Sequence, residues 1–161
     1  MLKYVNTGIV FQEIPNETTL SINISGCPNH CPGCHSAYLA EDIGMPLNEE
    51  TLDQMISSLD QNVTCISLMG GDNDVEAVQH LAEHIHQRYT GRYKVAWYSG
   101  KIRLPKWVDR NKFDYLKVGP YIAHLGPLTH QTTNQRLYRI HHEDETIEDI
   151  TYLFWKTHNF T

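Results

Sequence analysis

The sequence has few cysteines, no long hydrophobic run and no excess of basic residues. It contains four cysteines in 161 residues, and 13 Lys and Arg stand against 19 Asp and Glu, which gives a formal net charge of −6. An acidic balance argues against a nucleic-acid binder, which needs a basic face. No stretch reaches the length of a membrane span or of a signal-peptide core. We therefore expect no nucleic acid and no membrane as partners, and a reducing, cytoplasmic location.

The sequence also lacks internal repeats, low-complexity tracts and linkers that would divide the chain. Its length is sufficient for one domain with its own hydrophobic core. We expect a single domain over residues 1–161, with a core over about 18–140. The helical spacing of Ile147, Ile150 and Leu153 predicts a C-terminal helix over about 146–156.

Short apolar segments alternate with helical patterns along the chain. We expect strands over 20–24, 65–69, 94–98, 113–118 and 137–140, a helix after the N-cap Asn48, another from Val75, and a short helix over 104–110. Such alternation predicts an α/β fold with a parallel sheet. Since a complete (β/α)8 barrel takes about 250 residues, we expect a curved, mostly parallel sheet that forms an open partial barrel.

Three cysteines follow the first of these strands as Cys-x3-Cys-x2-Cys, at Cys27, Cys31 and Cys34. Three nearby thiolates can bind one inorganic centre. A [4Fe–4S] cluster has four irons, so three thiolates leave one iron open to a small molecule. The alternatives are a structural zinc site, with His30 or His35 as the fourth ligand, or unrelated thiols. Disulfides fit poorly because three cysteines cannot all pair with one another.

Two more motifs directly follow predicted strands. Gly70-Gly71-Asp72 comes after the strand over 65–69, and Ser99-Gly100 after the strand over 94–98. The carboxyl ends of parallel strands collect ligands, so these motifs and the cysteine run predict one shared site. Each motif alone also fits a plain turn or a helix cap. We expect Cys65 to be a buried thiol rather than a fourth ligand. Lys117 can approach the carboxylate of a ligand bound at this edge or be an exposed lysine at a strand end, and we expect the exposed lysine.

The cysteine run resembles the signature of the radical S-adenosylmethionine (SAM) enzymes, in which the open iron binds SAM and one electron cleaves it to a 5′-deoxyadenosyl radical. A narrower resemblance covers about Thr18 to Ile140. The short length, the Cys31-Pro32-Gly33-Cys34 core, the Gly-Gly-Asp motif and Asn134-Gln135-Arg136 are similar to the activating proteins of anaerobic (class III) ribonucleotide reductases.

This resemblance implies a partial barrel of the radical SAM type and a [4Fe–4S] cluster on the three cysteines. It implies SAM binding by Gly70, Gly71, Asp72, Ser99, Gly100 and His35. It also implies two partners: the large subunit of the anaerobic reductase, where a glycine near the C-terminus becomes a radical, and a one-electron donor such as flavodoxin or ferredoxin.

Other functions remain open from the sequence. The chain can be an activase for another glycyl-radical enzyme, a radical SAM enzyme that acts on a small molecule, or a non-enzymatic, zinc-stabilised binding module. The segment Asn134-Gln135-Arg136 can close the site, bind the partner or cap nearby backbone groups.

Overall fold

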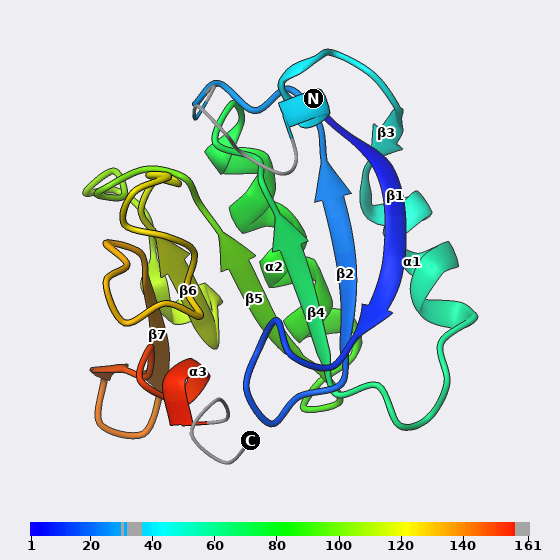
Figure 1. Ribbon diagram of the computed structural model, residues 1–161. Helices are drawn as coiled ribbons and strands as arrows, with labels where there is room; N and C mark the ends of the chain where they lie inside the picture. The colour runs from blue at the N-terminus through cyan, green and yellow to red at the C-terminus, as the bar shows by residue number, and fades with distance from the viewer. Residues whose placement is uncertain (30, 32–36, 157–161) are drawn as a thin grey trace.

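The alternating apolar segments pair into one eight-stranded sheet in a computed structural model that describes residues 1–29, 31 and 37–156 (Figure 1). The strand order is β3-β1-β2-β4-β5-β6-β7-β8. The strands are β1 Leu2–Val10, β2 Thr19–Ile24, β3 Met45–Leu47, β4 Cys65–Met69, β5 Lys94–Tyr98, β6 Tyr115–Val118, β7 Arg136–His141 and β8 Thr146–Asp149. The helices are α1 Glu49–Ser57, α2 Val75–Arg88 and α3 Leu153–Lys156, with short 3-10 turns over Ala37–Ala40 and Arg110–Lys112.

The centre of the sheet is parallel and both of its margins are antiparallel. β2, β4, β5 and β6 pair in parallel, so their carboxyl ends lie at one edge. The margins add β1 and β3 on one side and β7 and β8 on the other, all in antiparallel pairings. The sheet is therefore mixed rather than mostly parallel, because chain reversals such as the short turn between β7 and β8 favour antiparallel neighbours. The partial-barrel form stays a prediction.

Helices α1 and α2 lie against the same face of the sheet (Figure 1). α1 begins at Asn48, as predicted. The Asn48 side chain accepts a hydrogen bond from the Thr51 backbone N at 2.9 Å, and the Thr51 hydroxyl accepts one from the Asn48 backbone N at 3.0 Å. This reciprocal cap satisfies two backbone donors that a helix otherwise leaves open.

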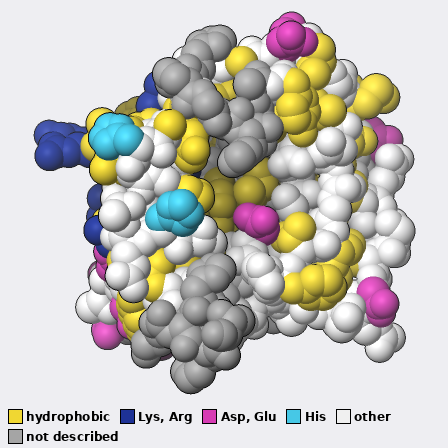
Figure 2. All heavy atoms as spheres, viewed as in Figure 1, with side chains coloured by type: hydrophobic (Ala, Val, Ile, Leu, Met, Phe, Trp, Pro, Cys, Tyr) yellow, Lys and Arg dark blue, Asp and Glu magenta, His cyan; other side chains and the backbone are white. Residues whose placement is uncertain are grey.

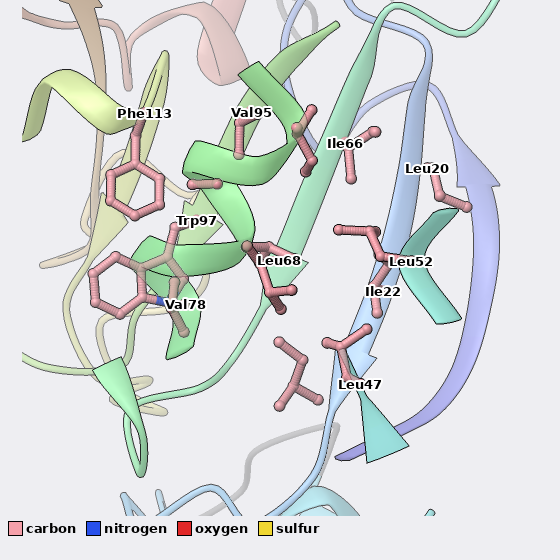
Figure 3. Close-up of a cluster of buried hydrophobic side chains, with 14 of the residues drawn as sticks. Leu20, Ile22, Leu47, Leu52, Ile66, Leu68, Val78, Val95, Trp97 and Phe113 are labelled. Carbon is pink, nitrogen blue, oxygen red and sulfur yellow. The ribbon is translucent and has the colours of Figure 1, made fainter. Parts of the chain in front are cut away.

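The main hydrophobic core fills the space between the sheet and these two helices. Figure 3 shows side chains from neighbouring strands meeting Leu52 of α1 and Val78 of α2. Trp97 is fully buried in this core and stacks on Phe113, with 5.4 Å between the ring centroids. A second, smaller core on the opposite face joins the sheet to α3 through Phe154. The parallel centre of the sheet is thus packed on both faces.

The predicted C-terminal helix is wrong over its first part. Residues 146–149 form β8, and Ile147 pairs with Ile140 across the hairpin. The Asp149 carboxylate then accepts hydrogen bonds from the backbone N and hydroxyl of Thr151, so the chain turns before α3. β-branched Thr146 and Ile147 favour the strand once β7 supplies a partner. The short helix predicted over 104–110 is also wrong, since only Arg110–Lys112 form a 3-10 turn.

No helix within the described ranges has the length and apolar character needed to cross a bilayer. The longest of these helices, α2, has 14 residues, whereas a membrane-spanning helix takes about 20.

A carboxylate between α1 and α2 makes a prediction about stability. Asp53 accepts hydrogen bonds from the Tyr89 hydroxyl at 2.7 Å and from His84 at 2.9 Å. Partial burial raises the pKa of Asp53, but these bonds and the charges of His84 and Arg88 outweigh it and lower the pKa overall. We expect Asp53→Asn to lower the free energy of unfolding by about 1 kcal/mol at pH 7.

The pH dependence of this effect follows from the lowered pKa. A carboxyl whose pKa is lower in the folded state stabilises the fold above its unfolded pKa, and this stabilisation disappears as the pH falls through the folded pKa. Urea titrations at pH 7 and below about pH 3 should therefore show a gap between wild type and variant that closes in acid. An equal gap at both pH values contradicts the assignment.

Candidate functional site

Three strand ends meet at the carboxylate of Asp72, directly after β4. Its Oδ1 accepts a hydrogen bond from the Ser99 hydroxyl at 2.6 Å, and its Oδ2 accepts one from the Gly100 backbone N at 2.8 Å. The same Oδ2 accepts a third, at 2.7 Å, from the side-chain amide of Asn29 in the cysteine segment. The structure therefore brings three of the predicted motifs together. A carboxylate offers about four acceptor positions, so one remains for a further donor.

The two glycines before Asp72 are required by their surroundings. Gly70 and Gly71 have φ values of +122° and +97°, which L side chains rarely adopt. A Cβ at Gly71 would lie 2.4 Å from a methyl carbon of Val78 in α2, and one at Gly70 would lie 3.0 Å from the carbonyl oxygen of Ile24. The Gly-Gly pair thus lets the turn lie closely between β2 and α2.

The carbonyl oxygens of this turn already accept hydrogen bonds within the protein. The Trp97 indole donates to Gly70 O at 2.7 Å, and the Asp74 backbone N donates to Gly71 O at 3.0 Å. Each carbonyl keeps a second lone pair. The binding of SAM by these two carbonyls stays a prediction.

The first residues of the cysteine segment, 27–29, lie at the same edge, where Asn29 contacts Asp72. Cys27 and Cys31 are free, partly exposed thiols, and the Cys27 backbone N donates to Leu39 O at 2.8 Å. Free thiols at the open end of a sheet suit an iron–sulfur cluster. Cys34 and His35, together with the alternative zinc ligand His30, lie outside the described residues. Within the described part of the chain, no three His, Cys, Asp or Glu side chains are grouped to hold a metal ion.

Cys65 lies away from this site, as predicted. It is fully buried at the start of β4, beside Thr19 at the start of β2, and therefore at the opposite edge of the sheet. Burial, together with the charge of Glu17, raises the pKa of the Cys65 thiol well above its ordinary value. A buried protonated thiol is a poor metal ligand, so Cys65 belongs to the core.

Lys117 is buried, although the sequence predicted an exposed lysine. Its side chain is only 9% exposed, and Nζ donates to Ser99 O at 3.2 Å and to Gly119 O at 2.9 Å. The expected exposed lysine is in fact buried, because the ends of β5 and β6 supply carbonyl oxygens for its ammonium group. Lys117 thereby ties Ser99 to the end of the next strand.

The segment Asn134-Gln135-Arg136 divides between two places. The amide of Asn134 donates to Pro120 O at 3.1 Å and that of Gln135 to Gly119 O at 3.4 Å, so both brace the turn after β6. Arg136 instead begins β7 and lies 3.7 Å from the Asp149 carboxylate. Of the three roles left open, backbone capping describes the contacts of Asn134 and Gln135, while closure and partner binding stay predictions.

Sequence reasoning missed Asn29. Its side-chain Nδ2 lies 2.7 Å from Asp72 Oδ2 and 3.5 Å from Cys27 Sγ, so one amide links the cysteine segment to the Gly-Gly-Asp turn. Its position inside the Cys-x3-Cys spacing was the available signal, since Asn side chains commonly bond nearby backbone and loop groups.

This contact makes a prediction about the reduction potential of a cluster bound through Cys27. A donor to a ligand sulfur favours the reduced, more negative state, so Asn29→Ala should lower the potential of such a cluster. About 1 kcal/mol for one hydrogen bond corresponds to about 40 mV for one electron. A redox titration followed by electron paramagnetic resonance measures this shift, and Asn23→Ala, an amide on β2 bonded to Asn6, is the control. An unchanged potential in Asn29→Ala contradicts the contact.

Comparison with known proteins gives one result. The family model described as a 4Fe-4S single cluster domain matches residues 17–141, which include the three cysteines, Gly70-Gly71-Asp72 and Ser99-Gly100. No curated protein and no solved structure matches the chain. The match favours iron over the structural zinc that the sequence left open. The chain therefore belongs to the 4Fe-4S single cluster domain family and is an iron–sulfur protein.

Proposed function

We propose that this protein is a radical SAM activase that generates a glycyl radical on the large subunit of an anaerobic ribonucleotide reductase. The observation that carries the proposal is the meeting of three strand ends at Asp72. There a cysteine segment, a Gly-Gly-Asp turn and a Ser-Gly turn lie within hydrogen-bond distance of one carboxylate. A site of this composition suits a cluster beside a cationic amine.

The residues fit distinct roles in this proposal. Cys27, Cys31 and Cys34 would hold the [4Fe–4S] cluster, which together with SAM would supply one-electron cleavage and hydrogen-atom abstraction. The remaining acceptor position of Asp72 would accept a hydrogen bond from the amino group of SAM. Ser99 and Gly100 hold that carboxylate in place. Their hydrogen bonds restrict its orientation, which is how a protein prepares a cofactor site before binding.

The face of the sheet opposite α1 and α2 favours a protein as the substrate. Figure 2 shows this face hollowed near its centre, with hydrophobic side chains at the bottom of the hollow. By the alternation of side chains along a strand, Ser67 and Tyr98 are on this face, opposite Leu68 and Trp97 of the main core. Ser67 is fully buried and Tyr98 packs against the second core, so both lie beneath the surface of this face. A hollow on the surface can receive a loop of a protein substrate, and that substrate itself then covers the site.

The test uses anaerobically reconstituted protein. Reduction with dithionite in the presence of SAM should yield 5′-deoxyadenosine, and addition of the large reductase subunit should yield a glycyl radical signal by electron paramagnetic resonance. Substitution of the target glycine by alanine in that subunit should abolish the signal. SAM cleavage with no radical on the reductase would redirect the assignment to another glycyl-radical enzyme or a small molecule. Intact SAM would rule out radical SAM chemistry.

A further inference from the structure

Residues 101–110 follow β5 and end at the first residue of the 3-10 turn before β6. This segment, here called the 101–110 loop, forms a basic and apolar surface. Its four basic side chains are all exposed, in a chain whose net charge is −6: Lys101, Arg103, Lys106 and Arg110. Two large apolar side chains also reach solvent, since Ile102 is 73% and Trp107 is 56% exposed. Exposed Trp and Arg together are typical of residues that dominate binding energy in interfaces.

A groove of about 670 Å³ runs between this loop and the sheet. Leu104 and Val108 form one wall, and apolar side chains of β6, β7 and β8 form the other: Leu116, Val118, Tyr138, Ile140 and Ile147. This is the same face that α1 and α2 cover beside β2, β4 and β5 (Figure 1). Beyond α2 the loop takes the place of a helix and leaves the apolar groove open.

The loop begins at the candidate site itself. The Gly100 backbone N donates to Asp72, and a Cβ at Gly100 would lie only 2.5 Å from Nδ2 of Asn29 in the cysteine segment. The next residue is also fixed, since Lys101 N donates to the Ser99 hydroxyl at 3.1 Å and Gly119 N donates to Lys101 O at 2.8 Å. A protein seated on the first residues of the loop therefore lies beside Asn29 of the cysteine segment.

The positive charge of the loop favours a partner with an acidic surface. Figure 2 shows Lys and Arg side chains gathered at one margin of the molecule, on the side of β6 and β7. Their field attracts an acidic surface and speeds its approach. The groove lies on the helix-covered face, whereas the hollow lies on the opposite face, so the two partners would contact different surfaces.

We infer that the 101–110 loop and its groove are the docking surface for an acidic one-electron carrier protein that reduces the cluster. Lys and Arg side chains of the loop steer the carrier, and Trp107 with Ile102 provides the apolar contact. The inference rests on the proposed function for the identity of the partner. Reduction of the cluster is nevertheless visible by absorbance without SAM or reductase, so the two proposals can fail separately.

The experiment compares two reductants of one reconstituted protein in a stopped-flow instrument. The probes are photoreduced flavodoxin, an acidic carrier, and dithionite, a small ion. The variants are Arg103→Glu/Lys106→Glu and, separately, Trp107→Ala. The control is Arg139→Glu, an exposed arginine of β7 whose side chain is on the other face of the strand from Tyr138 and Ile140.

We expect reduction by flavodoxin to slow by about tenfold or more in the charge-reversal variant at low salt, and the difference to shrink as salt screens the charges. Trp107→Ala should slow the reaction at both salt concentrations. Reduction by dithionite should be unchanged in all variants, which shows that each is folded with its cluster intact. Equal flavodoxin rates in wild type and variants overturn the inference. The inference is also overturned if the variants change only the sedimentation of this protein without flavodoxin, because the loop is then an interface between two copies of the chain.

Discussion

Replacement of Cys31 by alanine is expected to leave the reconstituted protein without a stable [4Fe–4S] cluster and without SAM cleavage. Wild-type protein should hold about four irons per chain. With one thiolate missing, the cluster loses one of its three proposed protein ligands, and the two remaining thiolates are too few to hold it while one iron stays open. Iron and sulfide assays, with the absorbance of the thiolate-to-iron bands, measure the loss.

Cys65→Ala is the matched control for this prediction. It removes another free thiol, but one that is buried at the far edge of the sheet. This variant should keep its iron and its SAM cleavage, and lose only about 1 kcal/mol of stability from the small cavity. Full iron content in Cys31→Ala, or loss of iron in Cys65→Ala, would contradict the assignment of the ligands.

The second large effect is expected for Asp72→Ala. This substitution removes the shared acceptor of Asn29, Ser99 and Gly100. Each lost hydrogen bond destabilises the assembled site by about 1 kcal/mol. Three such bonds amount to about 3 kcal/mol, which lowers the fraction of protein with an assembled site by about 100-fold. The rate of 5′-deoxyadenosine formation should fall by at least that factor, while iron content stays near the wild-type value because the thiol ligands are untouched.

Asp74→Ala separates this effect from general damage to the start of α2. Asp74 is the N-cap of the helix and lies two residues from Asp72, but its carboxylate accepts from Ala77 N and pairs with the N-terminal amine. Its loss should cost about 1 kcal/mol of stability and leave SAM cleavage within a few-fold of wild type. Equal rates in the two variants would show that Asp72 acts only as a structural residue.

The sequence was most informative where side chains meet strong local constraints. Leu20, Ile22 and Ile24 alternate with small polar residues, and this pattern located β2 correctly. The Gly-Gly pair marked a turn because only glycine fits the backbone between Ile24 and Val78. Parallel pairing of β2, β4 and β5 then predicted that the strand-end motifs share an edge, and the contacts of Asp72 confirm that they do.

The elements that were missed depend on tertiary partners. All four residues of β8 are exposed, so no buried face gives it a period, and only the register with β7 makes it a strand. The hydrogen bond from Asn29 to Asp72 joins residues 43 positions apart, which no local pattern encodes. Lys117 is buried because two strand ends supply carbonyl oxygens, and a lysine in the sequence gives no sign of that surrounding.

The hydrogen bond from the Trp97 indole to Gly70 O has a consequence for how the protein fails. The largest side chain of the core is the same one that fixes the turn before Asp72. Damage to the interior therefore reaches the cofactor edge without a change in any ligand. We therefore expect heat, denaturant or a distant packing defect that loosens Trp97 to cause loss of the cluster together with unfolding, as one cooperative unit. Bleaching of the cluster during a thermal ramp should then report global unfolding, and a colourless preparation signals a folding fault as readily as an oxidative one.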